Sequence, residues 1–276
     1  MKTLAQAKVN LGLDIKGIRE DGYHELDMIM APISLYNEIE IDHHTYDRIF
    51  CDKADLPENS TVHKALSLAR ETFGIQSRYD IKVFKHIPDQ AGLAGSSADG
   101  AAIFKAVLEL EGISVPEKRL LELGKQIGAD VPFCLVNRMA RVQGIGEKIR
   151  KLDTDWKLSC LLVKPQTGVS TPAAFKTWHQ LSPLSLNMDA IEKSILLKDY
   201  DQLIQSMANA LERPAFLLCP EILSLKEAME ARGLDRVMMT GSGSTLMGFS
   251  QDPMLLEKLQ KQFANQGYFS KVVTIG

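Results

Sequence analysis

The sequence predicts an α+β protein built from about two domains. Its 276 residues exceed the usual size of a single domain. Strand-like and helix-like segments follow one another without a regular βαβ order, which disfavours a doubly wound parallel sheet. The formal net charge of -3 disfavours a general nucleic-acid-binding protein, because such proteins carry a basic excess. We expect two domains, residues 1–163 and 164–276.

The N-terminal half begins with strands. Apolar runs predict them over three ranges, 4–15, 28–35 and 38–42. In the third range, apolar and charged residues alternate, so one face is expected to be buried. A helix follows between Ser60 as N-cap and Gly74 as stop, and the run 79–84 again predicts a strand.

Helices and strands mix in the rest of the chain. Ser114-Val115-Pro116-Glu117 predicts a capping box with proline at the first helical position, and Gly128 ends this helix. Strands are predicted at 140–144 and 159–163. The remaining predicted elements are helices 189–196, 200–211, 220–232 and 254–263, strands on either side of 241–243, and a last strand at 271–275.

Composition limits the setting of the protein. The four cysteines have no C-x-x-C spacing, which disfavours a zinc ribbon or a redox motif and favours a reducing compartment: Cys51, Cys134, Cys160 and Cys219. The N-terminus lacks the continuous apolar region of a signal peptide, and no apolar stretch approaches the roughly 20 residues that span a bilayer. We therefore expect a cytoplasmic protein whose partners include neither a membrane nor nucleic acid.

The segment 91–102 predicts a phosphate-binding loop. It reads Gly92-Leu93-Ala94-Gly95-Ser96-Ser97-Ala98-Asp99 and leads into a helix. Small residues let backbone N–H groups approach a phosphate, and a helix N-terminus adds unpaired donors. Lys85 lies just upstream and can reach the same anion, whereas Asp99 would repel a triphosphate unless a cation intervenes. A glycine turn with a serine cap, before a closely packed helix, explains the same residues.

A lysine and an aspartate are candidate catalytic residues. Lys8 and Asn10 are two apart in a predicted strand, so they point to the same face. A buried lysine there needs an anionic partner, although an edge-strand lysine that reaches solvent is an equally good interpretation. Asp130 lies between two predicted helices, where it could cap the second one or deprotonate a hydroxyl group. Lys8 opposite Asp130 would satisfy both charges.

Two polar turns and one aromatic residue complete the candidates. In Asp21-Gly22-Tyr23-His24-Glu25, Tyr23 could stack on a flat ligand and His24 could bond to the edge of a base, but a surface hairpin explains the turn as well. Phe175 is either a core residue or a second stacking wall. Gly241-Ser242-Gly243 is a second glycine-serine turn, which a tight hairpin also explains.

Taken together, the motifs resemble the GHMP small-molecule kinases. Five motifs match that family in order and spacing: Lys8-Val9-Asn10, Asp21-Gly22-Tyr23-His24, the loop 92–102, Gly128-Ala129-Asp130-Val131-Pro132-Phe133 and Thr240-Gly241-Ser242-Gly243. The second motif and Gly144-Ile145-Gly146-Glu147 resemble more narrowly the branch that phosphorylates a cytidine diphosphate-linked methylerythritol in isoprenoid precursor synthesis. The resemblance implies an N-terminal half like domain 2 of ribosomal protein S5 and a ferredoxin-like C-terminal half.

The resemblance also implies roles for individual residues. ATP, with Mg²⁺, would donate its γ-phosphoryl group to the 2-hydroxyl of the methylerythritol, with Asp130 as the base and Lys8 orienting it. Tyr23 and Phe175 would sandwich the cytosine while His24 bonds to its edge. The residues that match substrate-binding positions are Asn10, Tyr23, His24, Lys85 and Phe175. A monomer and a homodimer are both compatible with the resemblance.

The ATP-binding segments depart in part from the family pattern. By the resemblance, residues 92–99 would wrap the ATP phosphates, and Asn59 falls where the family contacts adenine. Ala94 and Ser96 replace two glycines of the usual loop, and Ala98 replaces a serine. A positive φ at either replaced glycine would cost about 1 kcal/mol or more. Two alternatives therefore stay open: another GHMP kinase that acts on homoserine, mevalonate or a related alcohol, and a ligand-binding paralogue with weak kinase activity.

Overall fold

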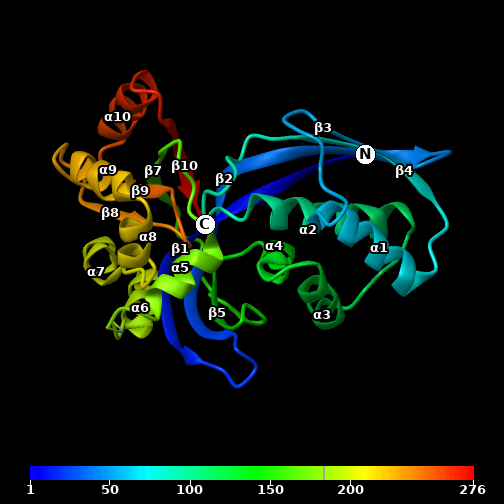
Figure 1. Cartoon of the computed structure of the whole chain (residues 1–276), viewed down its shortest axis with the longest axis horizontal. Helices are drawn as coiled ribbons and strands as arrows, with labels where there is room; N and C mark the ends of the chain where they lie inside the picture. The colour runs from blue at the N-terminus through cyan, green and yellow to red at the C-terminus, as the bar shows by residue number, and fades with distance from the viewer. Residues whose placement is uncertain (183) are drawn as a thin grey trace. The chain divides into compact units, whose positions relative to one another are not determined.

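The structure is a computed structural model that describes residues 1–182 and 184–276 (Figure 1). The described residues form the strands β1 (Lys2–Ile18), β2 (His24–His44), β3 (Arg48–Cys51), β4 (Arg78–Phe84), β5 (Ala140–Gly144), β6 (Lys148–Lys151), β7 (Leu158–Lys164), β8 (Arg236–Met239), β9 (Leu246–Phe249) and β10 (Phe269–Ile275). The helices are α1 (Thr61–Phe73), α2 (Gly95–Leu110), α3 (Glu117–Ile127), α4 (Val131–Val136), α5 (Thr171–Trp178), α6 (Met188–Leu197), α7 (Tyr200–Ser206), α8 (Glu212–Leu218), α9 (Pro220–Glu230) and α10 (Pro253–Asn265). Their irregular alternation confirms the predicted α+β class.

The backbone groups into two compact units, each made from separate stretches of the chain. The first unit comprises Met1–Ala7, Leu35–Ile87 and Ala94–Asn137. The second unit comprises Lys8–Ser34, Pro88–Leu93 and Arg138–Gly276. Strands β1 and β2 therefore contribute residues to both units. The linear domain boundary expected after residue 163 stays a prediction.

In the first unit, strands pack against helices. Strand β4 pairs antiparallel with β2 and parallel with β3. Ile39 and Ile41 of β2 are buried while Glu38 is exposed, so the predicted alternation is confirmed. Helices α1 and α2 pack side by side (Figure 1) and complete this core with apolar residues such as Phe104.

Both ends of α1 form as predicted, but the start of α3 does not. The Ser60 side chain accepts a hydrogen bond from the N–H of His63, and Gly74 ends α1 in the left-handed conformation. The predicted capping box before α3 is wrong, because Pro116 takes the N-cap position and no side chain caps the helix. The proline ring disfavours a helical conformation at Val115, so the helix cannot begin there.

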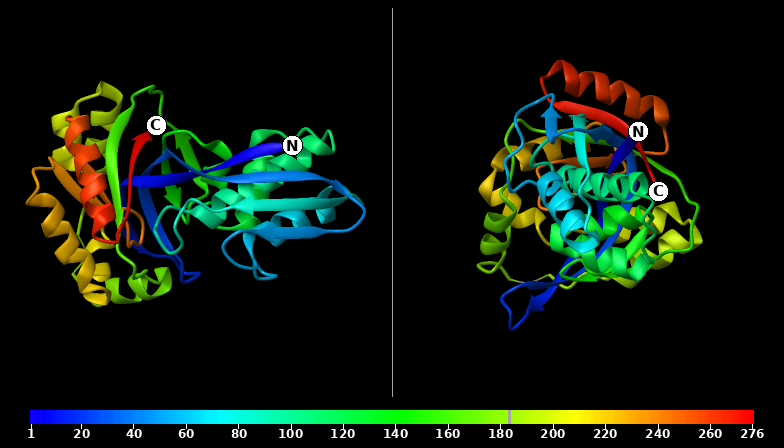
Figure 2. Two further views of the ribbon diagram at one scale, coloured as in Figure 1. Left: turned by 90° about the horizontal axis from the view of Figure 1, so that it is seen from above. Right: turned by 90° about the vertical axis from the view of Figure 1, so that its right-hand side faces the viewer.

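In the second unit, an antiparallel sheet runs in the order β6, β5, β2, β10, β7, β9, β8. Residues Cys160–Val163 of β7 are fully buried, which explains their continuous apolar run. Strand β10 places Phe269 opposite Lys164 and Ile275 opposite Leu158. Helix α10 packs on β10 and β7 (Figure 2).

Several elements differ from the prediction. The ranges 28–35 and 38–42 belong to one continuous strand, β2. Helix α7 ends before residue 211, because the N–H of Ala210 donates instead to the carbonyl oxygen of Leu13 in β1. Four short elements were not predicted, since each is too short for a clear periodic pattern: β3, β6, α5 and α8.

Two expectations from composition concern thiols and membranes. All four cysteines are free thiols, and Cys160 and Cys219 are buried, as small apolar residues usually are. Within residues 1–182 and 184–276, none of the helices has the length and apolar character that crossing a membrane requires.

Candidate active site

The predicted phosphate loop ends in the first turn of α2. The helix begins at Gly95, so Ser96 and Ser97 lie inside its first turn and not before it, which corrects the prediction. Backbone N–H groups of a first helical turn have no partner within the helix and carry a partial positive charge. The hydroxyl of Thr61 donates to the carbonyl oxygen of Ser96 and ties this turn to α1. The helix end thus has the chemistry of an anion site.

One of the two replaced glycines leaves the backbone in an unfavourable conformation. Ala94, the N-cap residue of α2, has φ of 56° and ψ of 33°, which is the left-handed region. An L-residue with a Cβ pays about 1–2 kcal/mol for that conformation. Ser96 lies within the helix, where its φ carries no such cost. The strain expected at the replaced glycines is therefore confined to Ala94.

The second glycine turn packs directly against the start of the loop. Gly92 has φ of 73°, and a Cβ there would collide with the carbonyl oxygen of Thr240. A Cβ at Gly241 would lie 2.8 Å from the carbonyl oxygen of Gly92. The N–H of Ser244 also donates to the carbonyl oxygen of Gln90 at 3.3 Å. The Gly241-Ser242-Gly243 turn is therefore a support for the loop, and its glycines allow the two backbones to approach.

A lysine side chain lies directly beside the carboxylate of Asp99. Its buried carboxylate lies 2.6 Å from Lys85 Nζ and accepts a hydrogen bond from Asn37 Nδ2 at 2.8 Å. Asn37 Oδ1 in turn accepts the N–H groups of His86 and Ile87 at 2.8 and 2.9 Å. Asn37 was missed from the sequence. The only signal for it was a polar residue at a position that the apolar pattern of β2 assigns to the core.

Lys8 is buried, so the interpretation as an edge-strand lysine that reaches solvent is wrong. It is 5% exposed, and its Nζ donates to Asn10 Oδ1 at 2.8 Å, as expected for two residues on one face of a strand. Asn10 is held in turn by its own N–H, which donates to the hydroxyl of Thr240 at 2.8 Å. The N–H of Lys8 donates to the carbonyl oxygen of Leu93 at 3.1 Å. Lys8 is therefore tied to the loop through its backbone.

Asp130 occupies the N-cap position of α4 without capping it. Its φ of -87° and ψ of -7° are helical, and its side chain makes no cap hydrogen bond. Pro132 lies in the first turn, as predicted. A helical N-cap residue points its side chain away from the geometry that reaches the second and third N–H groups. The interpretation of Asp130 as a simple cap is therefore wrong.

Aromatic rings gather where the polar turn before β2 meets α5. The His24 ring stacks on Phe175 at 4.3 Å between centroids and meets Trp178 edge-on at 5.9 Å. Its Nε2 lies 3.1 Å from Nε2 of His179, so one nitrogen carries the proton that the other accepts. Burial and the nearby His179 lower the pKa of His24. Tyr23 is 61% exposed and forms no wall opposite Phe175 in this structure.

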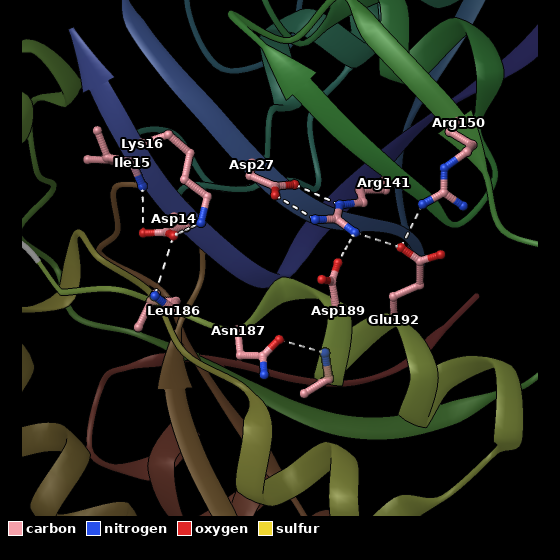
Figure 3. Close-up of polar contacts among 11 residues, drawn as sticks. Asp14, Ile15, Lys16, Asp27, Arg141, Arg150, Leu186, Asn187, Asp189 and Glu192 are labelled. Carbon is pink, nitrogen blue, oxygen red and sulfur yellow. Dashed lines mark hydrogen bonds and ion pairs between the residues drawn. The ribbon is translucent and has the colours of Figure 1, made fainter.

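An ion-pair network fixes the helix that follows this cluster, as Figure 3 shows. Arg141 of β5 binds Asp27 of β2 through two nitrogens at 2.9 and 2.7 Å. It also reaches Asp189 and Glu192 of α6 at 2.5 and 3.0 Å, and Arg150 joins Glu192 at 2.6 Å. Hydrogen bonds from these arginines hold the pKa of both α6 carboxyl groups below the usual range. The network joins α6 to the three strands β2, β5 and β6 and was not predicted.

A second buried carboxylate holds the segment just before α6. Asp14 accepts the N–H of Ile15 at 2.9 Å and that of Leu186 at 3.4 Å, and Lys16 pairs with it at 2.6 Å (Figure 3). Asn187 then caps α6 by accepting the N–H of Ala190 at 3.1 Å. The connection that starts at the aromatic cluster is thus anchored where it enters α6.

Two further expectations concern the contact with adenine and the binding of a metal ion. Asn59 is exposed and directly precedes the N-cap of α1, and its predicted contact with adenine stays a prediction. In the part of the chain that the structure describes, no group of three or more His, Cys, Asp or Glu side chains could hold a metal ion.

Comparisons with known proteins agree with this arrangement. Residues 60–138 match the GHMP kinases N terminal domain and residues 188–268 match the GHMP kinases C terminal family. A 4-diphosphocytidyl-2-C-methyl-D-erythritol kinase of Acetivibrio thermocellus is 39% identical over 253 residues, covering 90% of this chain and 89% of the relative. The protein of the same name from Clostridium botulinum is 37% identical over 263 residues, covering 94% of both chains.

Solved structures give the same answer at the level of the fold. A crystal structure of 4-(cytidine 5'-diphospho)-2C-methyl-D-erythritol kinase aligns with a TM-score of 0.85 at 31% identity, covering 100% of this chain and 99% of the other. A homoserine kinase from Cytophaga hutchinsonii aligns with a TM-score of 0.75 at 22% identity, covering 99% and 93%, and at that identity shows the fold alone. With two family matches and relatives above one third identity along nearly its whole length, this chain is a kinase and belongs to the GHMP kinase family.

Proposed function

We propose that this chain transfers the γ-phosphoryl group of ATP to the 2-hydroxyl of 4-diphosphocytidyl-2-C-methyl-D-erythritol, a step of isoprenoid precursor synthesis. The observation that carries the proposal is the 39% identity, over 90% of the chain, to a relative named as the kinase of that substrate. The Asp21-Gly22-Tyr23-His24 turn and Phe175 support it, since a cluster of flat rings suits a nucleobase better than a small aliphatic alcohol.

In the proposed reaction, the oxygen of the acceptor hydroxyl attacks the γ-phosphorus of ATP while Asp130 accepts the hydroxyl proton. The bond to the bridging oxygen breaks, and ADP leaves with that electron pair. Because the transition state is loose, positioning and charge neutralisation matter more than the strength of the base. The carboxylate of Asp130 is not used to cap α4, which supports this role. Lys8 supplies a buried ammonium group for orienting the base and for stabilising charge.

ATP is proposed to bind with its phosphates at residues 92–99, and Asn59 is proposed to contact adenine. The N–H groups at the start of α2 are the donors that support this assignment. When Mg²⁺ is bound, it neutralises charge on the β- and γ-phosphates. The hydroxyl of Ser96 or of Ser97 would hold it on the protein side.

The cytidyl half of the substrate is proposed to lie at Tyr23, His24 and Phe175, with Asn10 and Lys85 as further contacts. One face of Phe175 is covered by the His24 ring. A cytosine must therefore stack on the other face or displace His24. Tyr23 is exposed, and its proposed contact with the cytosine requires its ring to turn toward the ligand.

The proposal is tested by a coupled assay of ADP release with ATP and the cytidyl substrate. We expect Asp130→Ala to lower turnover by about 10²–10⁴-fold while its thermal unfolding midpoint stays near that of the wild type. Asp153→Asn removes an exposed carboxylate and should retain full turnover. Full turnover in Asp130→Ala would refute the assignment of the base, and no phosphorylation of the cytidyl substrate by the wild type would refute the proposed reaction.

A further inference from the structure

A charged pair lies buried beneath the first turns of α2. The side chains of Lys85 and Asp99 are 10% and 2% exposed, and they lie 2.6 Å apart. Asn37 donates to the other carboxylate oxygen at 2.8 Å, so the carboxylate is fixed from two sides. Burying an ammonium group is costly, and an ion pair with good geometry recovers much of that cost. Because the pair contributes little net stability, stability alone does not explain why it is buried here.

The position of Asp99 creates an electrostatic problem for a phosphate site. Asp99 follows Ser96 by three residues, a rise of about 4.5 Å along the helix. A full negative charge at that distance opposes the partial positive charge of the helix N-terminus. A triphosphate, which is itself highly negative, would feel this repulsion strongly in a partly buried site. Lys85 lies directly against the carboxylate and cancels its charge.

We propose that Lys85 is a positioning residue whose task is to act as the fixed counter-ion of Asp99 and so keep the start of α2 attractive to a polyphosphate. This inference rests on the proposed function, in which ATP phosphates bind at that helix end. It gives Lys85 a role through Asp99 that is separate from its proposed contact with the cytidyl substrate. Asn37 completes the device, because it holds the carboxylate and also the N–H groups of His86 and Ile87.

The inference predicts effects that depend on the sign of the charge removed. Lys85→Met leaves the carboxylate without the ammonium group and should weaken binding of ATP and of inorganic tripolyphosphate about tenfold. Asp99→Asn removes the negative charge and should tighten tripolyphosphate binding. The double variant Lys85→Met/Asp99→Asn and the charge-preserving Lys85→Arg should both return affinity to within about threefold of the wild type.

Isothermal titration of the full chain with ATP and with tripolyphosphate measures these affinities, and circular dichroism reports whether each variant is folded. Lys82→Met is the matched control, because Lys82 is a partly exposed lysine of β4, the strand that ends just before Lys85, and its loss should leave both affinities unchanged. If Lys85→Met does not fold, the tripolyphosphate affinity of Asp99→Asn relative to that of the wild type tests the inference.

Three results would overturn the inference. If Asp99→Asn weakens binding as much as Lys85→Met does, the pair is only a scaffold for the loop. If the double variant binds as weakly as Lys85→Met, charge cancellation is not the role of Lys85. The acceptor substrate is absent from these titrations. Tight ATP binding together with failure to phosphorylate the cytidyl substrate would therefore refute the proposed function and leave this inference standing. A wild type that binds neither ATP nor tripolyphosphate would refute both.

Discussion

Replacing Ala94 with glycine tests whether the phosphate loop carries a backbone cost. Ala94 has φ of 56°, a conformation that costs an alanine about 1–2 kcal/mol and costs glycine nothing. Glycine gains freedom in the unfolded chain, which offsets about 0.4–1 kcal/mol. The difference predicts that Ala94→Gly stabilises the fold by about 0.5–1 kcal/mol. For a chain of this size the thermal midpoint should rise by about 1–4 °C.

A second alanine of the same helix provides the control. Ala101 is buried within α2 and helical, so Ala101→Gly loses about 1 kcal/mol of helix propensity and about 0.8 kcal/mol of methyl burial. Its midpoint should fall by about 4–8 °C. Differential scanning calorimetry or urea unfolding measures both variants. A fall for Ala94→Gly as large as that for Ala101→Gly would refute the account of a strained loop.

Three further predictions follow from other parts of the structure. Gly92→Ala places a Cβ against a backbone carbonyl at a φ of 73° and should cost about 3 kcal/mol in urea unfolding; wild-type stability would contradict the close approach of the two turns. Arg141→Met leaves Asp27 buried without its arginine and should lower the free energy of unfolding by about 3–5 kcal/mol. Arg150 has a 59% exposed side chain, so Arg150→Met should lower it by less than about 1 kcal/mol. Equal losses of stability would show that the network does not anchor α6. Burial lowers the pKa of His24, so the contribution of the neutral ring to stability is fully present above about pH 6.5 and is lost as the pH falls through the folded-state pKa. His24→Asn should therefore flatten the pH dependence of the free energy of unfolding between pH 8 and pH 5. An unchanged slope would contradict burial of the ring.

Local sequence signals predicted much of the fold. The alternation around Ile39 and Ile41, and the cap and stop of α1 at Ser60 and Gly74, are confirmed because each depends on residues within one element. The capping box before α3 failed for a local reason too, since Pro116 restricts the residue before it. Short elements such as β3 and α8 form through tertiary pairing and packing, which no window of the sequence contains.

The candidate site also contains some residues that could be predicted from the sequence and others that could not. The loop at residues 92–99 could be proposed as a phosphate site because small residues at the start of a helix have a direct physical meaning for phosphate binding, and that assignment stays a prediction. The counter-ion of Asp99 could be anticipated as a need, and Lys85 was already a candidate cation, but Asn37 could not be identified. Its partners lie up to 62 residues away in the chain, and only the folded strand brings them together.

The network around Arg141 shows the limit most clearly. Its acidic partners come from β2 and α6, and the bond to Asp27 spans 114 residues. A single sequence contains no signal that pairs these charges, because register and helix placement decide which side chains meet. The same holds for His179, whose contact with His24 joins residues 155 apart.

The acceptor preference of the wild-type enzyme is the sharpest test of the proposed function. ADP release is measured with ATP and, in turn, 4-diphosphocytidyl-2-C-methyl-D-erythritol, the same methylerythritol without its cytidyl group, homoserine and mevalonate. We predict that kcat/KM for the cytidyl substrate exceeds that for every other acceptor by at least about 100-fold, because only this substrate carries a nucleobase that can stack at the proposed site around His24 and Phe175. Equal or faster turnover of an acceptor without the cytidine diphosphate group would contradict the account.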